Sequence, residues 1–104
     1  MIYYKLIRDN IPEICKKNKQ IAVTKTLNDK EYRKALRKKL LEETNEYLKS
    51  EELSELADIL EVVDALAKLQ GSDFEDILRL KSKKAETNGA FDKRLQLLRT
   101  KKIG

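Results

Sequence analysis

Two acidic residues lie on a helical stripe whose other members are apolar. Counting about 100° per residue places four apolar side chains within one narrow stripe: Tyr32, Leu36, Leu40 and Tyr47. Glu43 falls in the middle of that stripe, and Glu46 lies at its edge one turn later. An ionised carboxylate on a buried stripe is costly unless it is paired or bound to a metal. These two acids are therefore candidates for chemistry.

The next helical stretch repeats this pattern. Its apolar residues cover well over half of its circumference: Leu53, Leu56, Ile59, Leu60, Val62, Val63, Ala65, Leu66, Ala67 and Leu69. Glu61, Asp64 and Lys68 occupy the remaining face, where water is expected. Glu55 and Asp58 instead lie on the apolar arc, which makes them the second pair of misplaced acids.

An antiparallel hairpin that turns near Ser50 would bring the two pairs together. Glu46 then lies level with Glu55, and Glu43 lies level with Asp58. Each pair spans about 4.5 Å along its helix, at a rise of about 1.5 Å per residue. Four carboxylates would surround a space of metal-ion size. The alternative is that such acid pairs arise by chance on solvated helix faces, where this spacing is common.

The available ligand atoms favour a hard divalent cation. Mg²⁺ takes oxygen ligands and bridges carboxylates to substrate phosphates. The chain has no His and one Cys, which argues against a structural zinc site. We therefore expect Mg²⁺, with Mn²⁺ as the alternative ion.

Three segments resemble a known enzyme family. EETNE at 42–46 followed by ELAD at 55–58 resembles the EExxE…ExxD signature of the all-α nucleoside triphosphate pyrophosphohydrolases, a superfamily that includes MazG-like proteins. YKLIRDNIPEI at 4–14 is similar to the opening of its phosphoribosyl-ATP pyrophosphohydrolase-like branch. The resemblance covers nearly the whole chain.

The resemblance implies hydrolysis of a nucleoside triphosphate to the monophosphate and pyrophosphate, in a homodimer or homotetramer. It implies Mg²⁺ held by Glu43, Glu46, Glu55 and Asp58, with Glu42 nearby. The chain departs from the branch at 88–91, where Asn-Gly-Ala-Phe stands in place of an Arg and Gly-Gly-Phe. The Arg that supplies one phosphate-binding charge in that branch therefore has no counterpart at this position.

Phosphoryl chemistry also needs a base and cations near the phosphate oxygens. We expect Glu42 or Glu46 to act as the catalytic base, if not fully used in coordination. The candidate substrate-binding cations are Lys5, Arg8, Lys39, Lys81, Lys84 and Arg94. For Lys39, an ion pair with Glu42 or Glu43 is an equal alternative. For the later cations, a solvated helix face is the alternative.

Local signals predict a mainly α fold that positions these groups. Asn10 and Pro12 start a short helix, and Asn28 with Glu31 forms a capping box for a helix that runs to about residue 49. Ser50 is expected to cap a helix to about residue 70 that stops at Gly71, and a third long helix runs from a cap at residue 72 to about 87. Residues 1–7 and 21–27 alternate and predict a short β-hairpin.

Composition supports a single domain of 104 residues, spanning 1–104. A lone Cys15 and the lack of a signal-like leader or a long apolar run lead us to expect a cytoplasmic protein that does not enter the membrane. The helix from 51 to 69 is apolar over more of its surface than one neighbour covers. We therefore expect self-association that completes a four-helix-type core.

Other functions remain open at this stage. A phosphoribosyl-ATP pyrophosphohydrolase of histidine biosynthesis is the alternative within the enzyme class, and a catalytically inactive relative is another. A non-catalytic basic helical module that binds nucleic acid would explain the net charge of +5. It would leave the inward acids unexplained. Aromatic residues do not interleave the basic tail apart from Phe91, so we do not expect nucleic acid as a partner.

Overall fold

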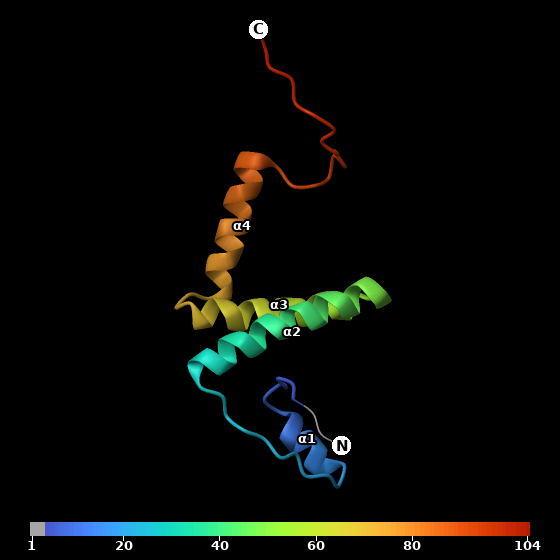
Figure 1. Cartoon of the computed structure of the whole chain (residues 1–104), viewed down its shortest axis with the longest axis vertical. Helices are drawn as coiled ribbons and strands as arrows, with labels where there is room; N and C mark the ends of the chain where they lie inside the picture. The colour runs from blue at the N-terminus through green and yellow to red at the C-terminus, as the bar shows by residue number, and fades with distance from the viewer. Residues whose placement is uncertain (1–3) are drawn as a thin grey trace. The chain divides into compact units, whose positions relative to one another are not determined.

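The part of the chain that the structure describes folds into four helices. The structure, a computed structural model, describes residues 4–104. In chain order the helices are α1 (Ile11–Lys17), α2 (Asp29–Ser50), α3 (Leu53–Leu69) and α4 (Phe74–Asn88) (Figure 1). Within that described range no residue belongs to a strand. The prediction of a mainly α fold is confirmed.

The expected amino-terminal hairpin is not confirmed. Residues 4–7 and 21–27 have irregular backbone, and residues 1–3 of the predicted first strand lie outside the described part. Ile21 and Val23 are 91% and 96% exposed. An alternating segment gains stability as a strand mainly when its apolar face is covered, and a lone two-stranded hairpin is marginal in water. This segment finds no such cover.

Side-chain capping starts α2 as predicted. The Oδ1 atom of Asn28 accepts a hydrogen bond from the Glu31 amide at 2.9 Å. The Oε1 atom of Glu31 accepts one from the Asn28 amide at 3.1 Å. These bonds satisfy two amides that the helix itself leaves without partners. Pro12 likewise lies in the first turn of α1, where a missing amide costs nothing.

The turn between α2 and α3 differs from the prediction in one respect. Ser50 is the last residue of α2 rather than the cap of α3, and Glu52 takes the cap position. Glu51 adopts a left-handed conformation with φ of 55° and donates its amide to the Tyr47 carbonyl. Ser50 Oγ then accepts the Glu52 amide at 3.2 Å. Its hydroxyl therefore stabilises the turn instead of the next helix.

The far end of α3 stops where the sequence predicts. Gly71 has φ of +77°, a conformation that glycine adopts without the strain of a Cβ atom. The Ser72 amide then reaches back to the Ala67 carbonyl at 2.9 Å. This closes α3 and fixes where the chain leaves it.

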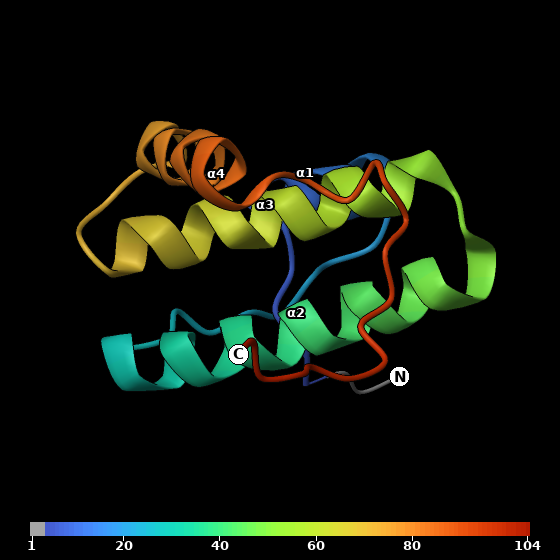
Figure 2. The same cartoon turned by 90° about the horizontal axis from the view of Figure 1, so that it is seen from above.

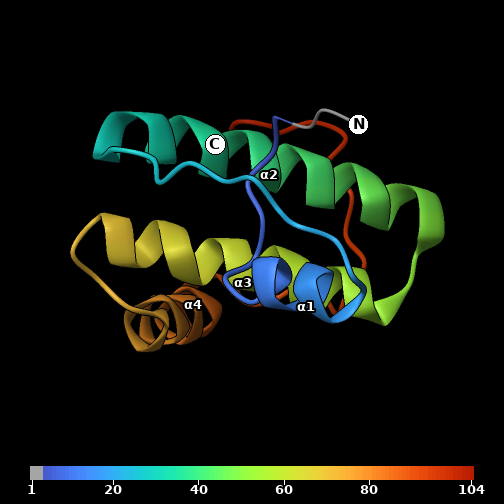
Figure 3. The same cartoon turned by 90° about the horizontal axis from the view of Figure 1, so that it is seen from below.

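The core lies between α2 and α3. Among the described helices, α2 and α3 pack against each other. They run side by side in opposite directions, joined by the short turn (Figures 2 and 3). The buried apolar side chains of the described range are Leu36, Val62 and Ala67. A hairpin with so few buried side chains holds its facing residues in register but leaves much apolar surface uncovered.

The chain divides into two compact units, one ending at Phe74 and the other comprising Glu75–Gly104. The second unit contains most of α4, which ends before Gly89, and an irregular exposed segment at 89–104. The expectation that 1–104 acts as a single domain stays a prediction. In the part of the chain that the structure describes, no helix has the length and apolar character to cross a membrane.

Candidate metal centre

Three carboxylates converge across the α2–α3 hairpin. Glu43 comes from α2, while Glu55 and Asp58 lie one turn apart on α3. One oxygen of each lies within 4.8 Å of the others. The Glu43 side chain is only 14% exposed, in keeping with its place on the apolar stripe of α2. We call these three residues the acidic cluster.

Glu46 stands beside the acidic cluster and is not one of its members. It is exposed on α2, one turn beyond Glu43 and rotated towards the edge of the stripe. Its charge still contributes to raising the pKa of Glu55. The structure therefore brings together three of the four acids that the sequence indicated as ligands and places the fourth next to them.

The pKa of Glu55 is raised above its ordinary value. Partial burial is the largest cause, followed by the charge of Asp58 and a hydrogen bond with that carboxyl group. The charges of Glu46 and Glu43 add to the effect. Burial and like charges both disfavour the ionised form. A cation bound at the acidic cluster would instead favour the ionised form of Glu55.

Two cations of the same chain pair with the acidic cluster. Arg8 Nη2 lies 2.7 Å from Asp58 Oδ1. Lys39 Nζ lies 3.3 Å from Glu43 Oε1 and 3.7 Å from Glu42 Oε2. The ion-pair alternative for Lys39 is thus what the structure shows. Glu55 has no ion pair among the described residues, so one acid of the cluster keeps an uncompensated charge.

The other predicted phosphate-binding cations come from other parts of the chain. Lys5 lies exposed in the segment before α1. Lys81 and Lys84 are exposed on α4, and Arg94 is exposed in the segment that follows. All three belong to the second unit. Their role in binding a substrate stays a prediction.

The pairing of Arg8 with Asp58 is the feature that sequence reasoning missed. The sequence indicates Arg8 as a candidate for binding phosphate and predicts no acidic partner for it. The two residues are separated by 50 positions, and no helical periodicity connects them. By contrast, the Asp64–Lys68 pair at 3.1 Å is an i, i+4 contact on the face predicted to meet water.

The donor set of the acidic cluster fits a hard divalent cation. It offers three carboxylates, the chain has no His, and its one thiol, Cys15, lies on α1. Oxygens on opposite sides of one Mg²⁺ are about 4.2 Å apart, given metal–oxygen distances of about 2.1 Å. Among three ligands only one pair can lie opposite, and the other pairs are adjacent, about 3.0 Å apart. Oxygens up to 4.8 Å apart must therefore approach one another by as much as about 1.8 Å, through side-chain rotation.

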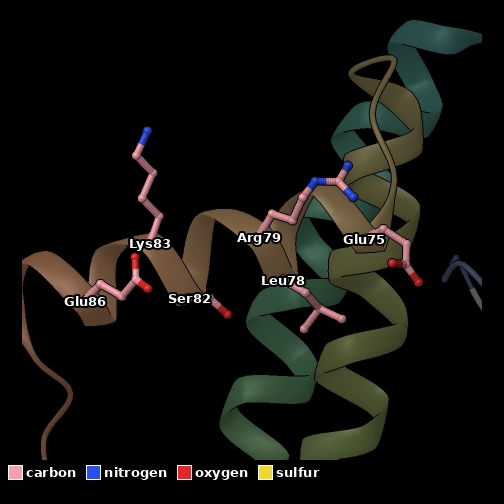
Figure 4. Close-up of a pocket in the computed structure, with 6 residues that line it drawn as sticks. All are labelled: Glu75, Leu78, Arg79, Ser82, Lys83 and Glu86. Atoms are coloured by element: carbon pink, nitrogen blue, oxygen red, sulfur yellow. The ribbon is translucent and has the colours of Figure 1, made fainter.

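A shallow hollow on α4 offers no comparable site. Figure 4 shows that the side chains lining it all arise from this one helix. They are Glu75, Leu78, Arg79, Ser82, Lys83 and Glu86. Arg79 is already paired with Asp76. The hollow carries two acids and two cations, so it presents no concentrated charge of either sign.

Comparisons with family models, with curated proteins and with solved structures find no match to this chain. The functional interpretation therefore rests on the geometry of the acidic cluster and on the resemblance of three short motifs.

Proposed function

We propose that the protein hydrolyses a nucleoside triphosphate, or a related nucleotide, to the monophosphate and pyrophosphate in a Mg²⁺-dependent reaction. The observation that carries this proposal is the convergence of Glu43, Glu55 and Asp58 from two facing helices. These acids fall within the two motifs that resemble the pyrophosphohydrolase signature. All three side chains that converge are thus acids of the motif.

Glu43, Glu55 and Asp58 would hold the ion, which is Mg²⁺ or alternatively Mn²⁺. When bound, it supplies positive charge for the phosphate oxygens and lowers the pKa of water in contact with it. The chain's own task is to fix the backbones of the three carboxylates on packed helices, so that only their side chains have to move. Their partial burial strengthens their attraction for a cation, since the local dielectric is lower than in bulk water.

Glu46 is the better of the two candidates for the catalytic base. It is exposed on α2 and has no ion pair among the described residues, so its carboxylate is available to accept a proton from water. Glu42 already shares Lys39 with Glu43. The Lys39 ammonium group thus lies against the Glu42 carboxylate, whereas Glu46 has no such contact among the described residues.

Lys39 and Arg8 are the cations placed to bind phosphate oxygens near the acidic cluster. Each lies against one of its carboxylates, so a phosphate bound at the cluster would be within reach of both. Lys5, Lys81, Lys84 and Arg94 remain further candidates from the sequence. Positive groups around the phosphate oxygens stabilise the charge that develops during transfer.

We also propose that the protein is a homo-oligomer. Leu41 and Leu48 on α2 are 63% and 68% exposed, while Leu53 and Leu60 on α3 are 81% and 51% exposed. Each pair is seven residues apart, which places its members on one face of a helix. Fully burying a leucine side chain contributes roughly 1.5–3 kcal/mol. A second hairpin covering these faces would add several such contributions and build a four-helix core.

A pyrophosphate-release assay tests the enzymatic proposal. The purified chain is incubated with Mg²⁺ or Mn²⁺ and a panel of common and damaged nucleoside triphosphates, with phosphoribosyl-ATP included as the biosynthetic alternative. We expect metal-dependent release from at least one substrate. A strong preference for phosphoribosyl-ATP would assign the alternative within the class.

Matched variants locate the activity. Asp58→Asn keeps the shape of the side chain but removes a ligand charge, so we expect a loss of at least about 10-fold, since even outer-shell partners of a metal are worth 10–100-fold. Glu61→Gln, an exposed acid on the same helix, should retain activity. Circular dichroism verifies the helices of both variants. Absence of hydrolysis in the wild type, together with DNA binding that weakens steeply with salt, would instead support the nucleic-acid-binding alternative.

A further inference from the structure

Arg8 is a cation delivered to the acidic cluster from a distant part of the chain. It precedes α1 in sequence, whereas its partner Asp58 belongs to α3. The contact of 2.7 Å joins the guanidinium to Oδ1, one of the two oxygens with which Asp58 can bind a metal. The side chains are 58% and 38% exposed, so the pair remains accessible to water and can exchange partners.

The guanidinium and a divalent cation make opposing demands on Asp58. Both need its negative charge, and each would repel the other at so short a distance. We infer that Arg8 competes with the metal for Asp58, and that metal binding transfers the Arg8 guanidinium from this carboxylate to a phosphate group of the substrate. This inference rests on the metal site of the proposed function. It assigns Arg8 a role in coupling metal binding to phosphate binding.

The strength of the ion pair suits this role. In an exposed ion pair, the population in contact exceeds the separated population by a factor of only about one to five. Arg8 should therefore weaken metal binding by about two- to six-fold in the absence of phosphate, since the metal must first displace it. A divalent ion with three carboxylate ligands can overcome so small a preference.

The released guanidinium is well suited to a phosphate. Its planar fork of donors matches two phosphate oxygens, and it keeps its charge at any accessible pH. The exchange thus predicts effects of opposite sign when Arg8 is removed. Metal alone should bind more tightly, whereas a phosphate ligand on the metal-loaded protein should bind more weakly. A residue that merely supports the fold would weaken both.

The chain contains a matched control. Lys25 forms an ion pair with Glu31 at 2.8 Å, with side chains 72% and 39% exposed. Glu31 precedes Glu43 by twelve residues on α2, which is about 18 Å along a helix. That distance is roughly twice the screening length of about 8 Å at physiological salt. Lys25→Gln therefore removes an equal charge and a similar ion pair without acting on the cluster.

The test uses calorimetric titration of the full chain. Mn²⁺ alone is titrated first, and inorganic pyrophosphate is then titrated at saturating Mn²⁺. We expect Arg8→Gln to bind Mn²⁺ about two- to six-fold more tightly than the wild type. We expect it to bind pyrophosphate at least about five-fold more weakly, through loss of a charge-assisted bidentate contact. Lys25→Gln should match the wild type in both titrations.

The outcomes separate this inference from the proposed function. A wild type that binds no Mn²⁺ removes the metal site and the inference with it. A wild type that binds Mn²⁺ with Arg8→Gln equal to it or weaker overturns the competition and leaves the metal site standing. If Arg8→Gln loses helical content, Arg8→Lys replaces it as the test variant. Lysine keeps the positive charge but lacks the planar set of guanidinium donors. Arg8→Lys should therefore bind Mn²⁺ about as tightly as the wild type and bind pyrophosphate more weakly.

Discussion

Replacing Glu55 by glutamine should stabilise the metal-free protein while removing its response to metal. Glu55 is the acid of the cluster without an ion pair among the described residues, and its pKa is raised from an ordinary value of 4.5. Since the folded state holds this proton more tightly than the unfolded chain, folding stability falls as pH rises from 4.5 through the folded-state pKa. At neutral pH the ionised carboxylate therefore disfavours folding. The neutral amide of Glu55→Gln removes that cost.

The effect of metal can be estimated from mass action. A ligand at one hundred times its dissociation constant stabilises the state that binds it by about 2.7 kcal/mol. With an unfolding entropy of about 2.1 cal/mol/K per residue, a chain of 104 residues gains about 12 °C in Tm. Loss of one carboxylate should weaken binding by about 10–100-fold, by analogy with outer-shell partners. The rise in Tm at the same concentration then falls to about 2–6 °C.

Differential scanning calorimetry at pH 7 with increasing MgCl₂ measures both effects. Metal-free Glu55→Gln should melt at or above the wild type, and its metal-induced rise should be half as large or less. Glu61→Gln lies on the same helix but outside the cluster, so it should keep the full wild-type rise. A metal-free Glu55→Gln variant that melts below the wild type would refute the electrostatic reasoning. An undiminished response to metal in that variant would refute its role as a ligand.

Two further predictions concern the rest of the chain. The pKa of Glu31 is lowered chiefly by its hydrogen bond with Lys25, so this pair stabilises the fold above pH 4.5 and loses that contribution as pH falls through the lowered folded-state pKa. Lys25→Gln should accordingly be slightly less stable than the wild type at pH 7, as expected for an exposed ion pair. The difference in denaturant midpoint should shrink as the pH falls from 4.5 through the lowered folded-state pKa of Glu31. The proposed homo-oligomer should have the molar mass of at least a dimer when light scattering is measured after size-exclusion chromatography at micromolar concentration. A uniform species of 12.1 kDa would contradict self-association.

The helices were predictable because their ends are fixed by local contacts. The Asn28–Glu31 capping box and the positive φ at Gly71 each involve residues within a few positions of one another. The turn at Ser50 was less predictable. It uses a left-handed Glu51, a conformation that non-glycine residues adopt only when the surrounding structure favours it. No local pattern signals that choice.

The acidic cluster was predictable to the extent that it depends on helical periodicity. Glu43 and Asp58 lie equally far in sequence from the turn between α2 and α3, so they face each other once these helices pack. Periodicity does not resolve whether an acid at the edge of a stripe, such as Glu46, turns towards the cluster or towards water. The Arg8–Asp58 contact was beyond reach, because it depends on how an irregular segment returns to the hairpin. Long-range contacts of this kind leave no periodic trace in a sequence.

Charge balance distinguishes the acidic cluster from an ordinary network of ion pairs. A structural network gains stability when each buried charge has a partner, and an unpaired charge in it is a cost. Here Arg8 and Lys39 compensate Asp58 and Glu43. Among residues 4–104, however, no cation pairs with Glu55, and Glu46 adds a further negative charge beside it. The excess negative charge lies between α2 and α3, where the carboxylates converge. A divalent cation would supply the missing positive charge, and its arrival would leave Arg8 and Lys39 with spare charge for a phosphate.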